Sequence, residues 1–356
     1  MKNKGLLVCI IPLLFTAVAC NNSEPAKKNY FSLWDENKST ALSTLKDFVN
    51  DVTNSNSKNY IPVEDRIATF DMDGTFIGEL YPTYFEYNLL EYRVLEDPTY
   101  RDIAPSDVIE AAQTIRDYSR GVITKFPEHF DMIHAHAAAK AYSGMSIAEF
   151  DKYVKDYAKK DANGFENMTY GESFYKPMLE IFDYLDDYGF TSYVVSGSDR
   201  YICRALVDSI GIEPNRVIGM DVVTKSSKQG DAEGVDYTMA SDEYLIRTDE
   251  LIIKNLKTNK VKQISQEIGK VPVLSFGNSS GDSAMHNYCK GNTKYNRTEV
   301  FMLIADDAER DHADLVETAK RKASWEEAGY NIISMKDDFK TIYGFDVIKT
   351  DFHFDD

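Results

Sequence analysis

A short apolar run that ends in two closely spaced carboxylates is the feature that most constrains this chain. Residues 67–70 (Ile-Ala-Thr-Phe) are short, β-branched and aromatic, which predicts a buried strand. Asp71 and Asp73 then fall at its carboxyl end, where open parallel sheets place their active sites. Because two carboxylates this close repel each other, the pattern favours a hard cation held by oxygen, most naturally Mg²⁺. The alternative is a solvated turn, since Asp-x-Asp-Gly also occurs in ordinary turns.

Two later segments repeat this arrangement of an apolar strand followed by small polar residues. Residues 190–195 predict a strand that ends at a Ser196 turn, and residues 271–276 predict one that is followed by Asn278. Helical segments, such as residues 260–268, separate the strands. Strands that alternate with helices imply an α/β fold with a doubly wound parallel sheet, in which strand ends can converge. Other strands are expected at residues 216–223, 301–304 and 331–335, with a hairpin excursion at residues 230–247.

The segment after the first strand has a helical pattern instead. Apolar spacing predicts helices that start near Pro82 and at residues 105–118 and 147–157. The segment is rich in tyrosine, and those rings either shape a pocket or, for most of them, pack helices together. His134 and His136 are two residues apart and would point to different faces of a helix, so we expect no two-histidine metal site. The expected organisation is a helical cap at residues 77–172, inserted into a core of residues 61–76 and 173–356.

The start of the chain has the pattern of an exported protein. Residues 1–4 are basic, residues 5–19 are apolar, and the apolar run is too short for a comfortable membrane span. Small residues before Cys20 resemble a bacterial lipoprotein cleavage site, although Ala17 stands where such sites usually carry Leu. We therefore expect residues 1–19 to be a signal peptide and Cys20 to be lipidated, with ordinary secretion as the alternative. Residues 20–60 are then a tether followed by a lead-in helix at residues 38–52.

The charge balance excludes some classes of partner. The 356-residue chain has 58 acidic and 40 basic residues, a formal net charge of −18. Such an acidic surface argues against nucleic acid and against a polybasic contact with membranes, because both need basic partners. Without the signal peptide and Cys20, the remaining cysteines are Cys203 and Cys289, which could pair in an oxidising compartment but do not form a disulfide framework.

Four segments, in order along the chain, resemble the motifs of the haloacid dehalogenase (HAD) superfamily, specifically its phosphoserine-phosphatase-like branch. Residues 70–75 (Phe-Asp-Met-Asp-Gly-Thr) match the first motif, and residues 194–198 (Val-Val-Ser-Gly-Ser) match the second. Lys260 matches the third, and residues 277–282 (Gly-Asn-Ser-Ser-Gly-Asp) resemble the fourth. The resemblance covers about residues 66–335 and implies a HAD-like core with an inserted helical cap.

The resemblance implies roles for these residues. Asp71 would be the nucleophile that forms an aspartyl phosphate, and Asp73 the general acid and then base. A general acid favours phosphoryl transfer over dehalogenation, because a halide needs no proton to leave. Ser196, with Gly197, would hold the phosphoryl group. Lys260 would offset negative charge on nucleophile and phosphate.

The same resemblance implies a Mg²⁺ site with one departure from the family. The ion would be held by the Asp71 carboxylate, the Asp73 main-chain carbonyl and the fourth motif. Asn278 stands where the family more often has Asp, so one negative charge is lost and metal affinity should fall unless another group compensates. Asp282 is expected to recover part of that affinity, by direct ligation or through the neighbouring ligands.

Three other lysines compete with Lys260 for its role: Lys254, Lys257 and Lys262. We prefer Lys260 because it opens the helix that leads into the last motif, as in relatives. The sequence thus predicts a lipid-anchored, periplasm-facing, Mg²⁺-dependent phosphatase for a small organic phosphate. Cap aromatics favour an ester whose alcohol carries an amine or quaternary ammonium group. The alternatives are a phosphotransferase or mutase with the same intermediate, and a catalytically silent binding lipoprotein on the same scaffold.

Overall fold

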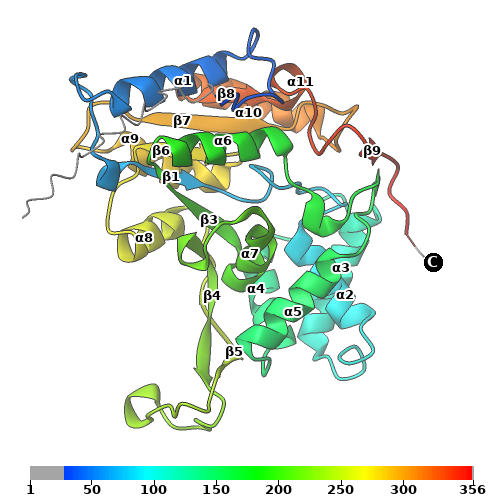
Figure 1. Ribbon diagram of the computed structural model, residues 1–356. Helices are drawn as coiled ribbons and strands as arrows, with labels where there is room; N and C mark the ends of the chain where they lie inside the picture. Colours follow the sequence, from blue (N-terminus) through cyan, green and yellow to red (C-terminus); the bar gives the residue numbers. More distant parts are fainter. Residues whose placement is uncertain (1–27, 355–356) are drawn as a thin grey trace, which may run out of the picture.

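A seven-stranded sheet forms the centre of the computed structural model, which describes residues 28–354 (Figure 1). All neighbouring strands are parallel except the last pair at one edge, β4 and β5, which is antiparallel. The predicted doubly wound α/β fold is therefore confirmed. In spatial order the strands are β5 (Leu245–Ile253), β4 (Val217–Ser226), β3 (Thr191–Asp199), β1 (Ile67–Phe70), β6 (Leu274–Gly277), β7 (Glu299–Ile304) and β8 (Asn331–Ser334).

Strand β1 occupies the middle of the sheet, and all four of its residues are buried. Phe70 is in register with Val194 of β3 on one side and with Phe276 of β6 on the other. Because the three strands are parallel, the polar residues that follow them emerge at the same edge of the sheet. This register brings the predicted motifs together.

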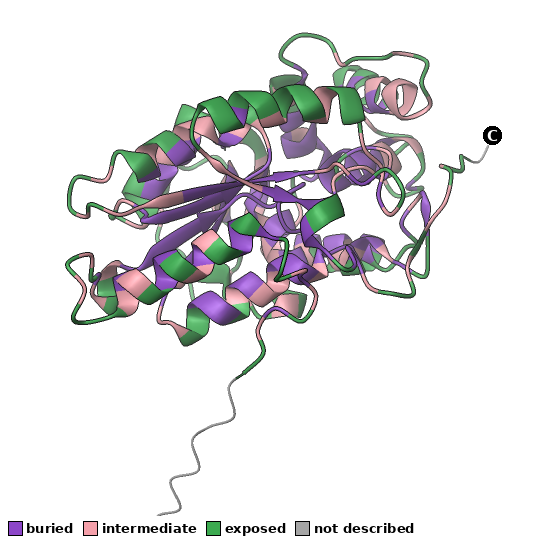
Figure 2. Cartoon of the chain, turned by 90° about the horizontal axis from the view of Figure 1, so that it is seen from above, coloured by how far each residue is buried: buried purple, intermediate pink, exposed green. Residues whose placement is uncertain are grey.

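Helices cover both faces of the sheet, so that the strands are buried between two exposed helical layers (Figure 2). Alternate residues of β7 show the two faces: Phe301 belongs to the main core cluster with α1 and α6, whereas Met302 packs with Trp325 of α10. Phe70 stacks on Phe276 with ring centroids 4.3 Å apart. The helices of the two layers are α1 (Thr40–Thr53), α6 (Lys176–Asp187), α7 (Arg200–Val207), α8 (Thr258–Glu267), α9 (Ser283–Lys290), α10 (Leu315–Glu327) and α11 (Met335–Asp338).

Four helices lie between β1 and β2 in the chain and stand beside the sheet near β5 (Figure 1). They are α2 (Phe85–Leu95), α3 (Ser106–Ser119), α4 (Phe130–Ala141) and α5 (Ile147–Ala158). Helix α5 begins with a capping box between Ser146 and Glu149, which satisfies the free N–H groups of its first turn. We refer to these four helices as the cap. A two-stranded ribbon, β2 (Phe165–Glu166) with β9 (Ile348–Lys349), joins the end of this segment to the end of the chain.

One local prediction is wrong, and another differs in its bounds. Residues 196–199 were expected to form a turn after the second strand, but β3 continues through them to Asp199, and its register with β4 shifts between Val195 and Asp199. Pairing with a neighbouring strand across a β-bulge thus overrides the turn preference of Ser-Gly-Ser. The hairpin expected at residues 230–247 is present with different bounds: β4 and β5 pair antiparallel, and residues 227–244 form the mostly exposed connection between them.

The described residues also bear on the cysteines and on membrane spans. Cys203 and Cys289 are both free and buried. Between residues 28 and 354, none of the helices combines the length and apolar character needed to cross a bilayer. The expected signal peptide, Cys20 and residues 21–27 of the tether lie outside the described residues.

Candidate active site

Asp71 and Asp73 lie in the tight loop that follows β1, and both are buried. The Asp71 N–H donates to the Phe276 carbonyl (3.0 Å), which continues the β1–β6 ladder up to the first carboxylate. Gly74 N–H then donates to the Ile77 carbonyl (2.7 Å) and closes the loop. Gly74 has φ +75°, a conformation that favours glycine and lets the loop turn back directly after Asp73.

Lys260, in the first turn of α8, connects two of the predicted site residues. Its Nζ donates to Asp71 Oδ1 (2.5 Å) and to Asp282 Oδ1 (2.6 Å), and the side chain is 1% exposed. Burial opposes the charged form of Lys260, but the charges of Asp282 and Asp71 outweigh it and raise its pKa. Lys260 is therefore a fixed cation beside Asp71, whereas Lys254 pairs with Glu86 (Nζ–Oε1 2.8 Å).

Burial is also the largest influence on the two aspartates. It raises the pKa of Asp71, Asp282 adds to that effect, and Lys260 opposes it. Burial raises the pKa of Asp73 to about 7, against a hydrogen bond from Ser198 that lowers it. Near neutral pH, Asp73 therefore exists in protonated and ionised forms, which suits a group that first donates and then accepts a proton.

The serines at the end of β3 have different positions from the ones predicted. Ser198 Oγ donates to Asp73 Oδ2 (2.7 Å), and Ser198 and Gly197 line the cavity in front of Asp73. Ser196 is fully buried behind them: its Oγ accepts from Ser198 N–H (3.0 Å) and lies 3.4 Å from Asp73 Oδ2. The structure thus brings Ser196 to the site but places Ser198, which sequence reasoning passed over, on the cavity wall.

Asn278 and Asp282 follow β6 and have different hydrogen-bond partners. Asp282 Oδ2 accepts the N–H groups of Asn278 (3.2 Å) and Ser279 (3.0 Å), while Oδ1 is occupied by Lys260. Asn278 Oδ1 accepts from Thr75 Oγ1 (3.4 Å), and the same hydroxyl lies 3.5 Å from Asp71 Oδ2. Asp71 Oδ2 and Asn278 Oδ1 therefore lie on either side of the same hydroxyl. Asp282 fixes the loop after β6 and the position of Lys260 through its hydrogen bonds.

These residues enclose a cavity of about 170 Å³ below the cap. Tyr84 and Tyr87, whose rings meet edge to face at 5.3 Å, form its upper wall together with Asp131 of α4. Asp71, Asp73, Lys260 and Asn278 therefore share one cavity, with Ser196 behind it. Its full lining is Asp71, Asp73, Glu79, Tyr84, Glu86, Tyr87, Asp131, Gly197, Ser198, Lys254, Leu256, Lys260, Asn278, Ser279 and Asp282.

Three acidic lining residues, Glu79, Glu86 and Asp131, were not predicted from the sequence. Glu86 on α2 accepts from Lys254 and from the Asp199 N–H (3.1 Å), so an ion pair joins the cap to the core beside the cavity. Glu79 accepts from Asn278 Nδ2 (3.0 Å). The only sequence signal for Glu79 is its place in the same loop as Asp73, and no local pattern marks Glu86 or Asp131. Lys254 had been considered only as an alternative to Lys260.

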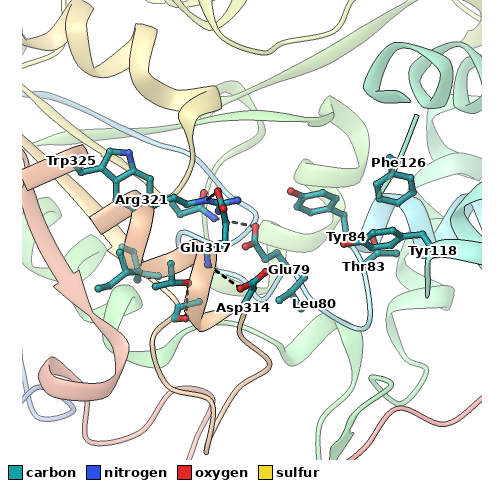
Figure 3. Close-up of a pocket in the computed structure, with 16 residues that line it drawn as sticks. Glu79, Leu80, Thr83, Tyr84, Tyr118, Phe126, Asp314, Glu317, Arg321 and Trp325 are labelled. Atoms are coloured by element: carbon teal, nitrogen blue, oxygen red, sulfur yellow. Dashed lines mark hydrogen bonds and ion pairs between the residues drawn. The ribbon is translucent and has the colours of Figure 1, made fainter. Parts of the chain in front are cut away.

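A second cavity of about 250 Å³ adjoins the first at Glu79, Tyr84 and Asn278, which line both. Figure 3 shows its two walls: Tyr84, Tyr118 and Phe126 on one side, and Glu317 and Arg321 of α10 on the other, with Glu79 between them. An ester whose phosphoryl group lies at Asp71 therefore has space for a larger alcohol beyond Glu79.

The donor atoms fit a hard cation. Asp73 Oδ1 is buried and has no hydrogen-bond partner, which indicates an unmet electrostatic demand at the site. Across residues 28–354, no group of three or more His, Cys, Asp or Glu side chains is arranged to hold a metal by itself. Mg²⁺ would instead take the Asp71 carboxylate, the Asn278 amide oxygen and the Asp73 main-chain carbonyl, all of them hard oxygen ligands.

Known proteins resemble this chain in structure. No family model matches it, and a search of curated proteins gives no match either. A conserved protein of unknown function from Anaerococcus prevotii has 15% identity and a TM-score of 0.51, over 86% of this chain and 94% of that chain.

Two other solved structures are less similar. A phosphoserine phosphohydrolase-like protein from Francisella tularensis has 13% identity and a TM-score of 0.40, over 72% of this chain and 92% of that chain. Cytosolic 5′-nucleotidase IIIB bound to cytidine has 10% identity and a TM-score of 0.46, over 86% and 88%. The likeness to the Anaerococcus prevotii protein concerns the fold alone, which is a mostly parallel α/β sheet with an inserted, mainly helical cap.

Proposed function

We propose that this chain is a Mg²⁺-dependent phosphomonoesterase that hydrolyses a small organic phosphate through an aspartyl-phosphate intermediate. One observation carries the proposal: Asp71, paired with the buried cation Lys260, shares a cavity with Asp73, whose pKa of about 7 suits proton transfer. A nucleophile, an acid–base group and a fixed positive charge are what phosphoryl transfer through a carboxylate requires.

In the first step, Asp71 attacks phosphorus with Oδ2, the oxygen that Lys260 does not occupy. The new P–O bond to Asp71 forms as the P–O bond to the alcohol breaks. The electron pair of the broken bond stays on the alcohol oxygen, which takes the proton from Asp73. Lys260 balances the negative charge that gathers around Asp71.

In the second step, the ionised Asp73 accepts a proton from a water molecule, and the oxygen of that water molecule attacks phosphorus. The bond between phosphorus and Asp71 breaks, and inorganic phosphate leaves. Ser198 holds the Asp73 carboxyl through both steps by its 2.7 Å hydrogen bond. Mg²⁺, held by Asp71, Asn278 and the Asp73 carbonyl, would supply neutralisation of the charge on the transferring phosphoryl group.

The walls of the cavity favour an ester of an amino alcohol. Tyr84 and Tyr87 offer aromatic faces, and Glu79 and Asp131 offer carboxylates in the same space. A primary or quaternary amine is stabilised by both kinds of group. A panel of phosphocholine, phosphoserine and sugar phosphates tests this preference, and equal turnover of all three would remove it.

The proposal is tested by turnover of an aryl phosphate with Mg²⁺ and with a chelator, in wild type and in Asp71→Asn. We expect activity with Mg²⁺, little with chelator, and a loss of at least about 1,000-fold in Asp71→Asn, because the carboxamide cannot act as the nucleophile. Asp156→Asn, an exposed change on α5, is the matched control and should keep full activity. Release of phosphate that is indifferent to Asp71→Asn would refute the mechanism.

The same assay separates the alternatives. A new phosphate ester formed from an added acceptor alcohol would assign a phosphotransferase with the same intermediate. Absence of any turnover across the substrate panel would leave the silent binding protein as the better account.

We also propose that the protein is lipid-anchored in a bacterial cell envelope through Cys20, which lies outside the described residues. Lipidation adds acyl chains whose burial in the bilayer holds the protein at the membrane. Cys20→Ser should move the protein from the membrane fraction to the soluble fraction, and Cys9→Ser, a matched change in the same segment, should not. Equal fractionation of the two variants would contradict the anchor.

A further inference from the structure

Glu79 makes a contact in the candidate cation site that the HAD resemblance does not account for. Its Oε2 accepts a hydrogen bond from Asn278 Nδ2 (3.0 Å), across 199 positions of the sequence. Glu79 lines both cavities and lies between the aromatic wall and α10 (Figure 3). Arg321 faces it across the second cavity but contacts Glu317 (Nε–Oε1 3.3 Å), and within residues 28–354 no cationic side chain lies within 4.0 Å of Glu79.

The hydrogen bond decides which atom of the Asn278 amide faces Asp71. Glu79 is an acceptor, so it holds the NH₂ group of the amide on its own side. The carbonyl oxygen is therefore on the opposite side, where it shares the Thr75 hydroxyl with Asp71 Oδ2. Without an acceptor at position 79, a rotation of the amide would present a donor, which cannot bind a cation.

The charge of Glu79 matters as well as its geometry. Asp71 and Asp282 bring two negative charges to the site, and Lys260 neutralises one of them. Asn278 adds none, whereas an aspartate at this position would add one. Glu79 brings a further carboxyl to the site through its contact with Asn278, so the carboxyl that is missing at position 278 is present on another loop. Burial raises the pKa of Glu79 to about 7, and a cation beside it favours the ionised form.

The surrounding backbone is built to hold this contact. A side-chain carbon on Gly74 would lie 1.9 Å from Asn278 Nδ2 and 2.4 Å from Glu79 Oε2, so the contact exists only above a glycine. Gly78, directly before Glu79, is held by its N–H to the Ser173 carbonyl (2.8 Å) and by Tyr81 Oη to its own carbonyl (2.6 Å).

A second polar group in the same cavity lacks a partner. Asp73 Oδ1 is buried and has no hydrogen-bond partner, and Asp73 lines this cavity. A buried carboxylate oxygen without a partner is unfavourable unless positive charge is supplied nearby.

We propose that Glu79 is a positioning residue of the cation site: it orients the Asn278 amide so that its oxygen faces the ion, and it brings to the site the carboxyl that asparagine at position 278 lacks. The proposal rests on the Mg²⁺ site of the proposed function and extends it to a residue outside the four motifs. Residues that orient metal ligands contribute strongly to affinity, by about 10- to 100-fold in known sites.

The test is the affinity of the full chain for Mn²⁺, measured by EPR of the free ion, in wild type and three variants. Glu79→Gln keeps an acceptor but loses the charge, so its Kd should rise about 10-fold. Glu79→Met loses both and should bind more weakly still. The double variant Glu79→Gln/Asn278→Asp moves the charge to position 278, where the amide introduced at position 79 can donate to it, and should return to within about threefold of wild type.

Glu317→Gln is the matched control, because it removes a carboxylate from the opposite wall of the second cavity without touching Asn278, and its Kd should equal that of wild type. Thermal unfolding in chelator checks that every variant is folded. The proposal is overturned if Glu79→Gln binds Mn²⁺ like wild type, if the double variant binds no better than Glu79→Gln, or if wild type does not bind Mn²⁺.

Failure of this proposal and failure of the proposed function give different results. If Mn²⁺ binding depends on Glu79 but the protein shows no turnover, the phosphatase proposal is refuted and the proposed role of Glu79 is supported. If turnover depends on Asp71 but Mn²⁺ binding is unchanged in the Glu79 variants, the phosphatase proposal is supported and the proposed role of Glu79 is refuted.

Discussion

Asp311 is a buried carboxyl that the proposed reaction does not use. Its Oδ1 accepts from the Tyr343 hydroxyl (3.0 Å) and from the His312 N–H (2.8 Å). Burial raises its pKa to about 7, and these two hydrogen bonds only partly oppose the effect. The native protein therefore holds a proton on Asp311 at mildly acidic pH, whereas the unfolded chain, with an ordinary aspartate, does not.

This difference predicts how Asp311 affects stability with pH. A raised native pKa contributes stability that is present below the unfolded pKa, near 3.8, and is lost as the pH rises through about 7. Wild type should therefore lose about 3 kcal/mol relative to Asp311→Asn between pH 5 and pH 8. Urea unfolding of both proteins at the two pH values measures it. An equal difference at both pH values would mean that Asp311 is ionised throughout.

At the scale of single residues, some site residues could be predicted from a local sequence pattern, and the positions of others depend on contacts between distant segments. Asp71 and Asp73 could be predicted because a strand pattern and two acidic residues lie in one short stretch of sequence. Ser198 could not be separated from Ser196, because the bulge in β3 decides which hydroxyl reaches the cavity wall. Lys260 was preferred to Lys254 on its place in the helix, and the two ion pairs show that they belong to different partners.

At the scale of elements, β5 joins the cap to the core. Arg247 on β5 is fully buried, and its Nη2 pairs with Asp199 Oδ2 at the end of β3 (2.6 Å). Its guanidinium lies over the Phe150 ring of α5, 4.1 Å from the ring centre, and its backbone N–H donates to the Met145 carbonyl (2.8 Å). One residue thus connects two strands of the sheet with a helix of the cap.

Arg247→Ala should therefore destabilise the protein strongly. It would leave the buried Asp199 carboxylate without its cation, and removing one partner of a buried pair costs about 3–5 kcal/mol. Lys152→Ala, which removes an exposed i,i+4 pair with Asp156 on α5, should cost less than about 0.5 kcal/mol. Urea unfolding compares the two variants. Similar midpoints would mean that the Arg247 pair contributes no more than a surface contact.

The elements themselves were predicted unevenly. Helices over residues 106–119 and 147–158 appear within a residue of their expected bounds, because their apolar spacing is regular and local. Helix α4 was not foreseen: it is alanine-rich and largely buried, so it has little amphipathic contrast to detect. Strands β3 and β4 run longer than expected because each gains hydrogen bonds from a neighbouring strand, which a local pattern does not contain.

At the scale of the whole molecule, the proposed cation should stabilise the fold. A ligand that binds only the native state adds about 2.7 kcal/mol when present at 100 times its Kd. Mg²⁺ should therefore raise the Tm of wild type by about 5 °C in differential scanning fluorimetry, and chelator should reverse the shift. The shift should be much smaller in Asp71→Asn, which loses a charged ligand. A wild-type Tm that ignores Mg²⁺ would argue against the site.

The amino-acid sequence alone indicated the α/β class and the helical insertion through hydrophobic periodicity, and Asp71 and Asp73 through their place directly after a strand. Lys260 and the cation role of Asn278 were predicted from the resemblance to the HAD motifs. Folding was needed to bring Glu79 to Asn278, Lys254 to Glu86 and Arg247 to Asp199. These contacts join segments from 48 to 199 positions apart. Their strength comes from burial and from the direction of each hydrogen bond, and both exist only once the sheet and the cap are packed together.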